Sequence, residues 1–289
     1  MSLIDLHSRW GTERGFRGKW SNPEFIAAMK KFWNWNAEAM TEDEMVAYFR
    51  KNDARVILDT GKSSFFTKET PVDELIEQHD YGFEFERAHR DVILGHWLHF
   101  NPMVPEHLPE FRRCIDKKIG FLGIGAGPFP SAGDPAWDPY YRLCAEANLP
   151  VMIFVGMTAV GAGTPGGGGL PLDLTHPRHL DVTAAKYPNM KIVAARPGWP
   201  WQDETNATII HKGNIWYELH GWSPKYYPPS LKYEISHRLK DRILFGADYP
   251  MLKYERLVSD WRAEGYTEEI LQKVFHKNAE RFLESLGLE

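Results

Sequence analysis

The stretch Arg242-Ile243-Leu244-Phe245-Gly246-Ala247-Asp248-Tyr249-Pro250 lies near the end of the 289-residue chain and decides the fold. Its apolar run is short and is bounded by a charge and a glycine, which indicates a strand buried on both faces. Such strands belong mainly to parallel sheets. Asp248 follows the strand at its carboxyl end, where parallel α/β folds hold their active sites. The other strands therefore decide which side chains surround Asp248.

Seven further strand-like runs precede this one, separated by helical patterns. The expected strands cover residues 3–7, 56–59, 92–99, 119–124, 150–155, 191–196, 215–220 and 243–245. The expected helices cover residues 23–40, 72–89, 105–117, 138–147, 176–187, 201–211 and 229–240, with one more opening at the capping box Thr41–Glu44 and two at the end. Eight alternations in a chain near the ~250 residues of a typical barrel predict an α/β fold, the (β/α)8 TIM barrel.

The chain shows no linker or change of composition, so a single barrel domain over residues 1–289 is expected. Two stacked doubly wound domains are the alternative. The segment 10–40 follows the first strand and carries Trp10, Trp20, Phe32, Trp33 and Trp35. Loops after strands lie over the barrel mouth, so this segment is interpreted as an aromatic-rich lid, with a dimer contact or simple core as alternatives.

Composition excludes several classes of function. A net charge of −5 without a dense Lys/Arg block argues against a nucleic-acid surface. No apolar run approaches the ~18–20 residues that cross a bilayer, and the N-terminus lacks the features of a signal peptide. Cys114 and Cys144 stand alone in helical patterns and are expected to be reduced thiols. These features predict a cytoplasmic protein acting on a small molecule.

Three segments resemble the amidohydrolase superfamily, in its branch of aromatic-acid decarboxylases and related carbon–carbon hydrolases. They are residues 4–7, residues 187–201, and residues 244–250 together with Asn278-Ala279-Glu280-Arg281-Phe282. The resemblance implies a TIM barrel that hydrolyses or decarboxylates a small, typically aromatic, acid or its acyl derivative. The chain is similar to members described as 4-hydroxyphenyl-β-ketoacyl-CoA hydrolases. Members are often dimers, which makes a homodimer an expectation of the resemblance.

The resemblance also locates the family's metal ligands, and this chain departs from them. The family uses a His pair after the first strand, a His at the end of strand five, often one at strand six, and the last-strand Asp. Here these positions hold His7 with Arg9, then Phe154, Arg196 and Asp248. A divalent metal needs at least three protein ligands, and guanidinium groups repel a cation. The sequence therefore predicts no metal and no other cofactor at this place.

A metal-independent site is the resulting hypothesis. Arg9 and Arg196 would stabilise an oxyanion or enolate, while Asp248 and His7 would accept a proton from water or substrate. Non-oxidative decarboxylation is the alternative reaction, in which the arginines bind the carboxylate. An inactive relic, in which Arg196 forms a structural salt bridge with Asp248, is a further alternative, and a non-catalytic ligand-binding barrel is another. So is a rearranged zinc site in which His99 and His220 join His7 and Asp248.

Other side chains near strand ends are candidates for the pocket. His220 is expected to take part in catalysis. His99, Phe154, Trp199, Trp222, Tyr249 and the lid residue Trp20 are expected to contact the substrate.

Three other patterns are interpreted as structural. His96 and His99 lie three apart on a strand and so face opposite sides. His176 and His179 are interpreted as a helix-cap region, with chelation as the alternative. The glycines from Gly161 to Gly166 lack the following helix of a dinucleotide site and predict a loop over the mouth.

Overall fold

The computed structural model describes residues 2–15, 23–34, 38–60, 71–127 and 129–288. Within these ranges, eight parallel strands follow one another around the sheet in sequence order, as the (β/α)8 prediction requires. The strands are β1 (Leu3–Arg9), β2 (Ala54–Thr60), β3 (Ile93–His99), β4 (Phe121–Ile124), β5 (Val151–Phe154), β6 (Ile192–Ala195), β7 (Ile215–Glu218) and β8 (Ile243–Leu244).

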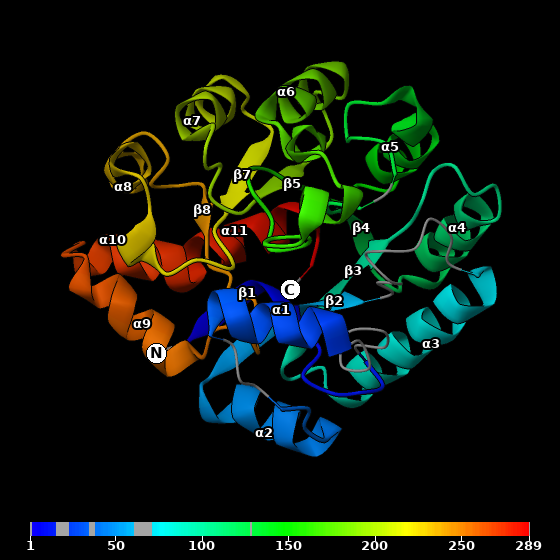
Figure 1. Cartoon of the computed structure of the whole chain (residues 1–289), viewed down its shortest axis with the longest axis horizontal. Helices are drawn as coiled ribbons and strands as arrows, with labels where there is room; N and C mark the ends of the chain where they lie inside the picture. Colours follow the sequence, from blue (N-terminus) through cyan, green and yellow to red (C-terminus); the bar gives the residue numbers. More distant parts are fainter. Residues whose placement is uncertain (1, 16–22, 35–37, 61–70, 128, 289) are drawn as a thin grey trace.

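Helices surround the strands (Figure 1). The α-helices are α1 (Pro23–Trp33), α2 (Glu42–Lys51), α3 (Val72–Ala88), α4 (His107–Lys117), α5 (Asp138–Glu146), α6 (Pro177–Lys186), α7 (Gln202–His211), α8 (Pro229–Ile235), α9 (Tyr254–Ala263), α10 (Glu268–Gln272) and α11 (Asn278–Ser285). Shorter helical turns are η1 (Pro135–Trp137), η2 (Pro165–Gly169), η3 (Leu172–Thr175), η4 (Pro224–Tyr226) and η5 (Lys273–Lys277). No helix in the described ranges combines the length and apolarity that crossing a membrane requires.

Backbone hydrogen bonds between β1 and the segment after β8 bring the two ends of the sheet together. Leu6 N–H donates to the Phe245 carbonyl at 2.9 Å, and Asp248 N–H donates to the His7 carbonyl at 2.9 Å. The Asp5 carboxylate adds side-chain bonds: it accepts from the Ala247 N–H and from the Tyr254 hydroxyl. Burial raises the pKa of Asp5 to about 6. The first and last strands therefore meet at the point where Asp248 begins the last loop.

The core has two parts on either side of the strands. Inside the barrel, apolar side chains such as Ile4, Met152 and Leu244 stack together with Phe282 of α11. Helix α11 crosses behind the strands in Figure 1 and covers the amino-terminal end of the barrel. A larger cluster lies between the strands and the outer helices. Because one end of the barrel is filled, only the carboxyl end is available for a site.

Several local predictions are confirmed. Thr41 and Glu44 form the capping box of α2, and the Thr267 side chain caps α10. His176 is the N-cap of α6 and accepts a hydrogen bond from the Arg178 N–H. Cys114 and Cys144 are free and buried.

Two helices end earlier than expected. The helix predicted over 23–40 ends at Trp33 because Asn34 adopts a left-handed conformation with φ 50°. The helix predicted over 229–240 ends at Ile235. There the side chains of Ser236 and His237 both bond to the Tyr233 carbonyl, which competes with continued helix.

The segment expected to form a lid contains helix α1, and its role as a lid remains a prediction. Helix α1 lies in front of β1 and β2 in Figure 1. The Phe32 ring of α1 packs on Gly163, where a Cβ would lie 2.1 Å from the ring. The insertion thus contacts the glycine-rich loop after β5. Trp20 and Trp35 fall outside the described residues.

Gly246, in the stretch 242–250, has no side chain and so leaves room for that of Glu218. A Cβ at this position would lie 1.6 Å from Glu218 Oε1 and 2.9 Å from the Cβ of His220. We expect Gly246→Ala to destabilise the fold by about 3 kcal/mol or more, because both neighbours are fully buried. Gly213→Ala is the control, since nothing lies within 4 Å of its Cβ, and should stay within about 0.5 kcal/mol of wild type. Denaturant unfolding measures both; equal stabilities would contradict this packing.

Candidate active site

Two candidate residues sit directly after strands in an unusual backbone conformation. Arg196 follows β6 with φ 82°, and Asp248 comes four residues after β8 with φ 57°. Residues other than glycine rarely adopt positive φ, and such positions gather at functional sites. Backbone bonds hold both: Arg196 N–H donates to the Glu218 carbonyl at 2.8 Å, and Asp248 N–H donates to that of His7. The fold thus holds both residues at the carboxyl end of the barrel.

Arg9 links two carboxylates at the end of β1. Its Nε donates to Asp248 Oδ1, and its Nη1 donates to Asp59 Oδ2 at 3.1 Å. Asp59, at the end of β2, also bonds to His7 Nε2 at 3.1 Å and to His99 Nε2. Arg9 and Asp59 therefore join five side chains, counting themselves, from three neighbouring strands and the last loop.

A second chain of contacts runs from Arg196 through His220 to Glu218. Arg196 Nε donates to His220 Nε2 at 2.9 Å, and His220 Nδ1 lies 2.5 Å from Glu218 Oε2. The guanidinium carbon of Arg196 lies 4.9 Å from the centre of the Phe154 ring. Among the described residues, Arg196 makes no ion pair with any carboxylate. Its terminal nitrogens are therefore available to an anion.

His7 connects the two networks. Its ring stacks on that of His220 with centroids 3.7 Å apart, and the Phe154 ring lies against both. His7 Nδ1 is buried without a hydrogen-bond partner and lies 3.7 Å from Asp248 Oδ1.

Exposure separates the site into two layers. Arg9, Arg196, Asp248 and His99 retain 4–7% of their surface, whereas His7, His220 and Glu218 retain none. Asp59 retains 1%. A ligand entering from the mouth would therefore meet the first four side chains, and the others support them from below.

Burial and the arginines set the charges. Burial lowers the pKa of His7 to about 4, and Asp59 offsets this only in part, so His7 is neutral near pH 7. Burial, with the charges of Asp5 and Asp248, raises the pKa of Glu218 well above its ordinary value. Burial would raise the pKa of Asp248, but Arg9, His7 and Arg196 together hold it below its ordinary value. Burial lowers the pKa of Arg196 to about 10. The upper layer thus holds an ionised carboxylate beside charged guanidiniums.

His7, His220 and Asp248 each bring one ligand atom within 4.8 Å of the others, as the rearranged metal site supposed. The hydrogen bonds oppose this use. His220 uses Nε2 for Arg196 and Nδ1 for Glu218, so of these three residues only His7 and Asp248 keep an atom with a vacant lone pair. Three vacant lone pairs are required for a minimal protein site. The residues as arranged therefore do not fit a metal ion.

Most of the predicted site residues converge, but Tyr249 does not. His7, Arg9, His99, Phe154, Arg196, His220 and Asp248 all lie in the networks described above. Tyr249 was expected in the pocket wall, and that prediction is wrong. It is fully buried outside the barrel, where it stacks on Tyr48 and donates to Met40 Sδ. The left-handed conformation of Asp248 turns the next side chain away from the mouth.

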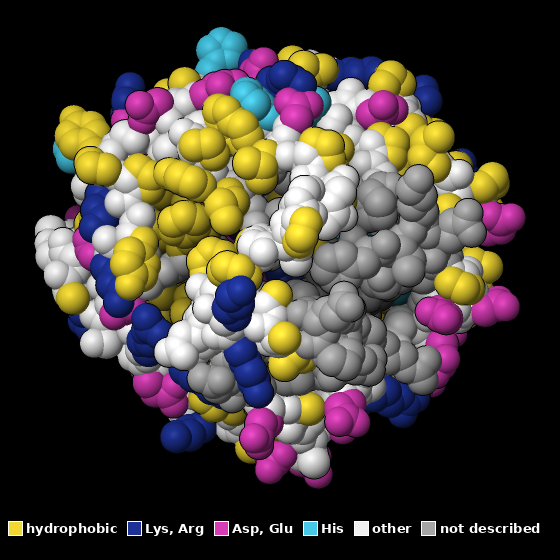
Figure 2. Space-filling model, viewed as in Figure 1, with side chains coloured by type: hydrophobic (Ala, Val, Ile, Leu, Met, Phe, Trp, Pro, Cys, Tyr) yellow, Lys and Arg dark blue, Asp and Glu magenta, His cyan; other side chains and the backbone are white. Residues whose placement is uncertain are grey.

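Trp199 and Trp222 lie on the rim rather than in the networks. They follow β6 and β7, and their rings are 6.4 Å apart. Trp199 is 45% exposed. Hydrophobic side chains gather over this side of the face seen in Figure 1, above α6 to α8 (Figure 2). Their contact with a substrate remains a prediction.

Two residues of the networks had no role in the sequence analysis. Asp59 and Glu218 are fully enclosed carboxylates at the last position or next to last of β2 and β7. Asp59 lies two residues after Ile57, which belongs to the cluster inside the barrel. Glu218 lies two residues after Trp216, which packs against the same cluster. A search for charged residues that interrupt the ends of buried strands would have found both.

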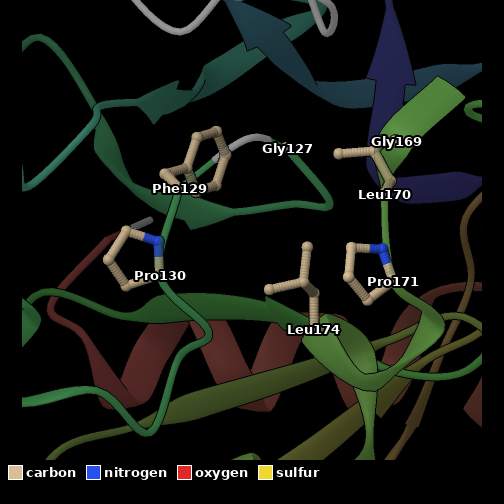
Figure 3. Close-up of a pocket in the computed structure, with 7 residues that line it drawn as sticks. All are labelled: Gly127, Phe129, Pro130, Gly169, Leu170, Pro171 and Leu174. Atoms are coloured by element: carbon tan, nitrogen blue, oxygen red, sulfur yellow. The ribbon is translucent and has the colours of Figure 1, made fainter.

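An open apolar groove lies among the mouth loops (Figure 3). It has a volume of about 290 Å³ and is lined by Gly127, Phe129 and Pro130 after β4 and by Gly169, Leu170, Pro171 and Leu174 after β5. Thr175, next to this lining, bonds to the Gly156 carbonyl just beyond β5. The described residues that line this groove are apolar and carry no charged side chain.

Comparison with known families matches residues 85–284, more than half of the chain, to the amidohydrolase family. The chain belongs to this family. Among curated proteins no sequence match is found.

Three solved structures illustrate the fold of this amidohydrolase. An uncharacterized TIM-barrel protein of Bordetella bronchiseptica has a TM-score of 0.79 and 18% identity, covering 99% of this chain and 100% of that one. The 5-carboxyvanillate decarboxylase of Novosphingobium aromaticivorans, complexed with manganese, has a TM-score of 0.71 and 16% identity over 98% and 96%. The 2,6-dihydroxybenzoate decarboxylase of Rhizobium has a TM-score of 0.68 and 14% identity over 98% and 99%. At these identities the likeness establishes the fold alone.

The buried neutral His7 should make the protein acid-sensitive. The unfolded state binds a proton at pKa 6.5, whereas folded His7 does so only near 4. Folding is therefore opposed increasingly as the pH falls from about 6.5 to about 4, by up to ~3 kcal/mol. In denaturant titrations, wild type should lose about 2–3 kcal/mol more than His7→Gln between pH 7 and pH 4.5.

The same change at the exposed His211 is the matched control, and its stability profile should parallel that of wild type. Parallel profiles for wild type and His7→Gln would contradict a neutral buried His7.

Proposed function

We propose that this protein is a metal-independent hydrolase of the amidohydrolase family that cleaves a carbon–carbon bond in a small aromatic β-keto acyl compound. The single observation that carries the proposal is the position of Arg196. A buried guanidinium without a carboxylate partner in the described part of the chain is costly unless an anion joins it. Arg196 lies near Asp248, the ionised carboxylate of the upper layer.

The two arginines have different surroundings. Arg9 contacts both Asp248 and Asp59, so its charge is largely satisfied within the protein. Among the described residues, the Arg196 guanidinium has the acceptor His220 and the Phe154 ring as partners and makes no ion pair. Arg196 is therefore the better candidate to stabilise negative charge on a substrate, while Arg9 holds Asp248 in place. This arrangement supports a site in which fixed guanidinium charge does the work that a Lewis acid does elsewhere.

The reaction would use Asp248 as the base. Asp248 accepts a proton from water as the water oxygen attacks the ketone carbon next to the aromatic ring. The resulting oxyanion lies against Arg196. Cleavage of the neighbouring carbon–carbon bond gives the aromatic acid and an enolate, and the enolate carbon takes the proton back from Asp248. Phe154 and the rim tryptophans would supply apolar surface for the aromatic group.

A direct assay uses the N-acetylcysteamine thioester of 3-oxo-3-phenylpropanoic acid. The expected products are benzoate and the acetyl thioester, in equal amounts. Asp248→Asn and Arg196→Gln should each lower kcat/KM by about 10²–10³-fold, as the loss of a base or of an oxyanion donor does. Arg178→Gln removes a half-exposed arginine at the rim and should leave kcat/KM unchanged. Unchanged activity in Asp248→Asn would refute the assigned base.

Product analysis also separates the competing reactions. Carbon dioxide release from hydroxybenzoates, without cleavage of the β-keto thioester, would identify a decarboxylase instead. Binding without turnover of either class would identify a non-catalytic barrel.

Metal removal is a separate test. Activity should survive dialysis against a chelator, and metal analysis of the active protein should find well under one ion per chain. The reason is that His220 uses both ring nitrogens in hydrogen bonds, which leaves His7 and Asp248 as only two of the three ligands that this cluster would need. Activity that is lost on chelation and restored by one equivalent of zinc or manganese would overturn the metal-independent proposal.

A further inference from the structure

Glu218 is a fully buried carboxyl group whose place in the reaction is not yet assigned. It lies on β7 and has no exposed surface. Its Oε2 lies 2.5 Å from His220 Nδ1, while its Oε1 has no hydrogen-bond partner. A buried carboxyl group with one unpaired oxygen lowers the stability of the fold. Its contact with His220 therefore requires an explanation in terms of function.

The direction of this contact follows from Arg196. A guanidinium only donates hydrogen bonds, so His220 Nε2 presents a lone pair to Arg196 Nε at 2.9 Å. The proton of a neutral His220 is then on Nδ1 and is donated to Glu218 Oε2. The chain of donation therefore runs from Arg196 to His220 to Glu218.

The surroundings fix this chain in place. His220 has no exposed surface; its ring stacks on that of His7, and the Phe154 ring lies tilted against it. Gly246 leaves the space that Glu218 occupies, because any Cβ there would overlap Oε1. With its Nε bonded to His220 and its face over Phe154, the Arg196 guanidinium is held in one plane. Its terminal nitrogens then remain for an incoming anion.

We propose that Glu218 is a positioning residue: it keeps His220 in the Nδ1–H tautomer, and His220 in turn orients Arg196 to receive the substrate's anionic group. This proposal rests on the proposed function, because it assumes that Arg196 binds an anion. His220 then acts through Arg196 rather than on the substrate itself. Removing the acceptor would allow the tautomer with a proton on Nε2, which cannot accept from Arg196 and would displace it.

The first test measures binding of benzoate as an anionic probe and of benzamide as its neutral counterpart. Glu218→Gln keeps a carbonyl acceptor for Nδ1–H, so its benzoate Kd should stay within about threefold of wild type. Glu218→Leu removes the acceptor at similar volume and should weaken benzoate at least tenfold, with benzamide unchanged. Arg196→Gln should abolish the preference for benzoate over benzamide.

The outcomes separate the two proposals. If Arg196→Gln loses benzoate binding but folded Glu218→Leu keeps it, Glu218 does not position Arg196, and the proposed function stands. If Arg196→Gln binds benzoate as well as wild type does, the anion role of Arg196 fails, and the proposed function fails with it. A fall in melting temperature alone, with binding intact, would mark Glu218 as structural.

A second measurement needs neither a ligand nor a variant of Glu218. The nitrogen-15 spectrum of histidine-labelled wild type, assigned to His220 by comparison with His220→Gln, should show Nδ1 protonated and Nε2 unprotonated. An Nε2–H tautomer for His220 would overturn the positioning role, even if Glu218→Leu cannot be folded.

Discussion

The contact between Arg9 and Asp248 is the interaction on which the site depends. It joins the end of the first strand to the loop after the last one, at the point where the two ends of the sheet meet. A buried ion pair gains little over its desolvation cost unless further bonds complete it. Asp59 supplies them, because it bonds to Arg9, His7 and His99 together. The contacts that close the barrel between β1 and the segment after β8 therefore also assemble the site.

This arrangement also explains the neutral groups beneath the mouth. Two arginines and the carboxylates Asp59 and Asp248 already occupy a small, nearly dry volume, where each further charge would be expensive. Burial therefore disfavours the charged forms of both Glu218 and His7: it raises the pKa of Glu218 and lowers that of His7 to about 4. Neutral groups can still fix geometry, since a hydrogen bond sets direction without adding charge. The side chains of the lower layer orient those of the upper layer, and the upper layer carries the charge.

The sequence revealed the barrel because each strand is a short apolar run between helical patterns, and this signal is local. It also revealed His7, Arg9, Arg196 and Asp248, since these stand where the resembling family keeps its metal ligands. Asp59 and Glu218 escaped notice because their importance depends on pairing between strands that are distant in the chain. The prediction for Tyr249 failed for another reason. The direction of its side chain depends on the left-handed backbone conformation of Asp248, which the pattern of apolar and polar residues does not indicate. The pairing of Asp248 with Arg9, and not with Arg196, likewise follows only from the three-dimensional arrangement.

Under the proposed function, the spacing of the charges links binding to catalysis. A carboxylate held beside guanidiniums is a weak base, because Arg9 and Arg196 both hold the pKa of Asp248 down. Arg9 is tied to Asp59 and keeps its influence whether or not a ligand is present. Arg196 is different, since an anion bound to its free edge would neutralise much of its field at Asp248. The pKa of Asp248 would then rise towards its ordinary range as the oxyanion forms, when a stronger base is needed to hold the proton from water. A metal ion, whose charge a single anion does not cancel, would lack this response.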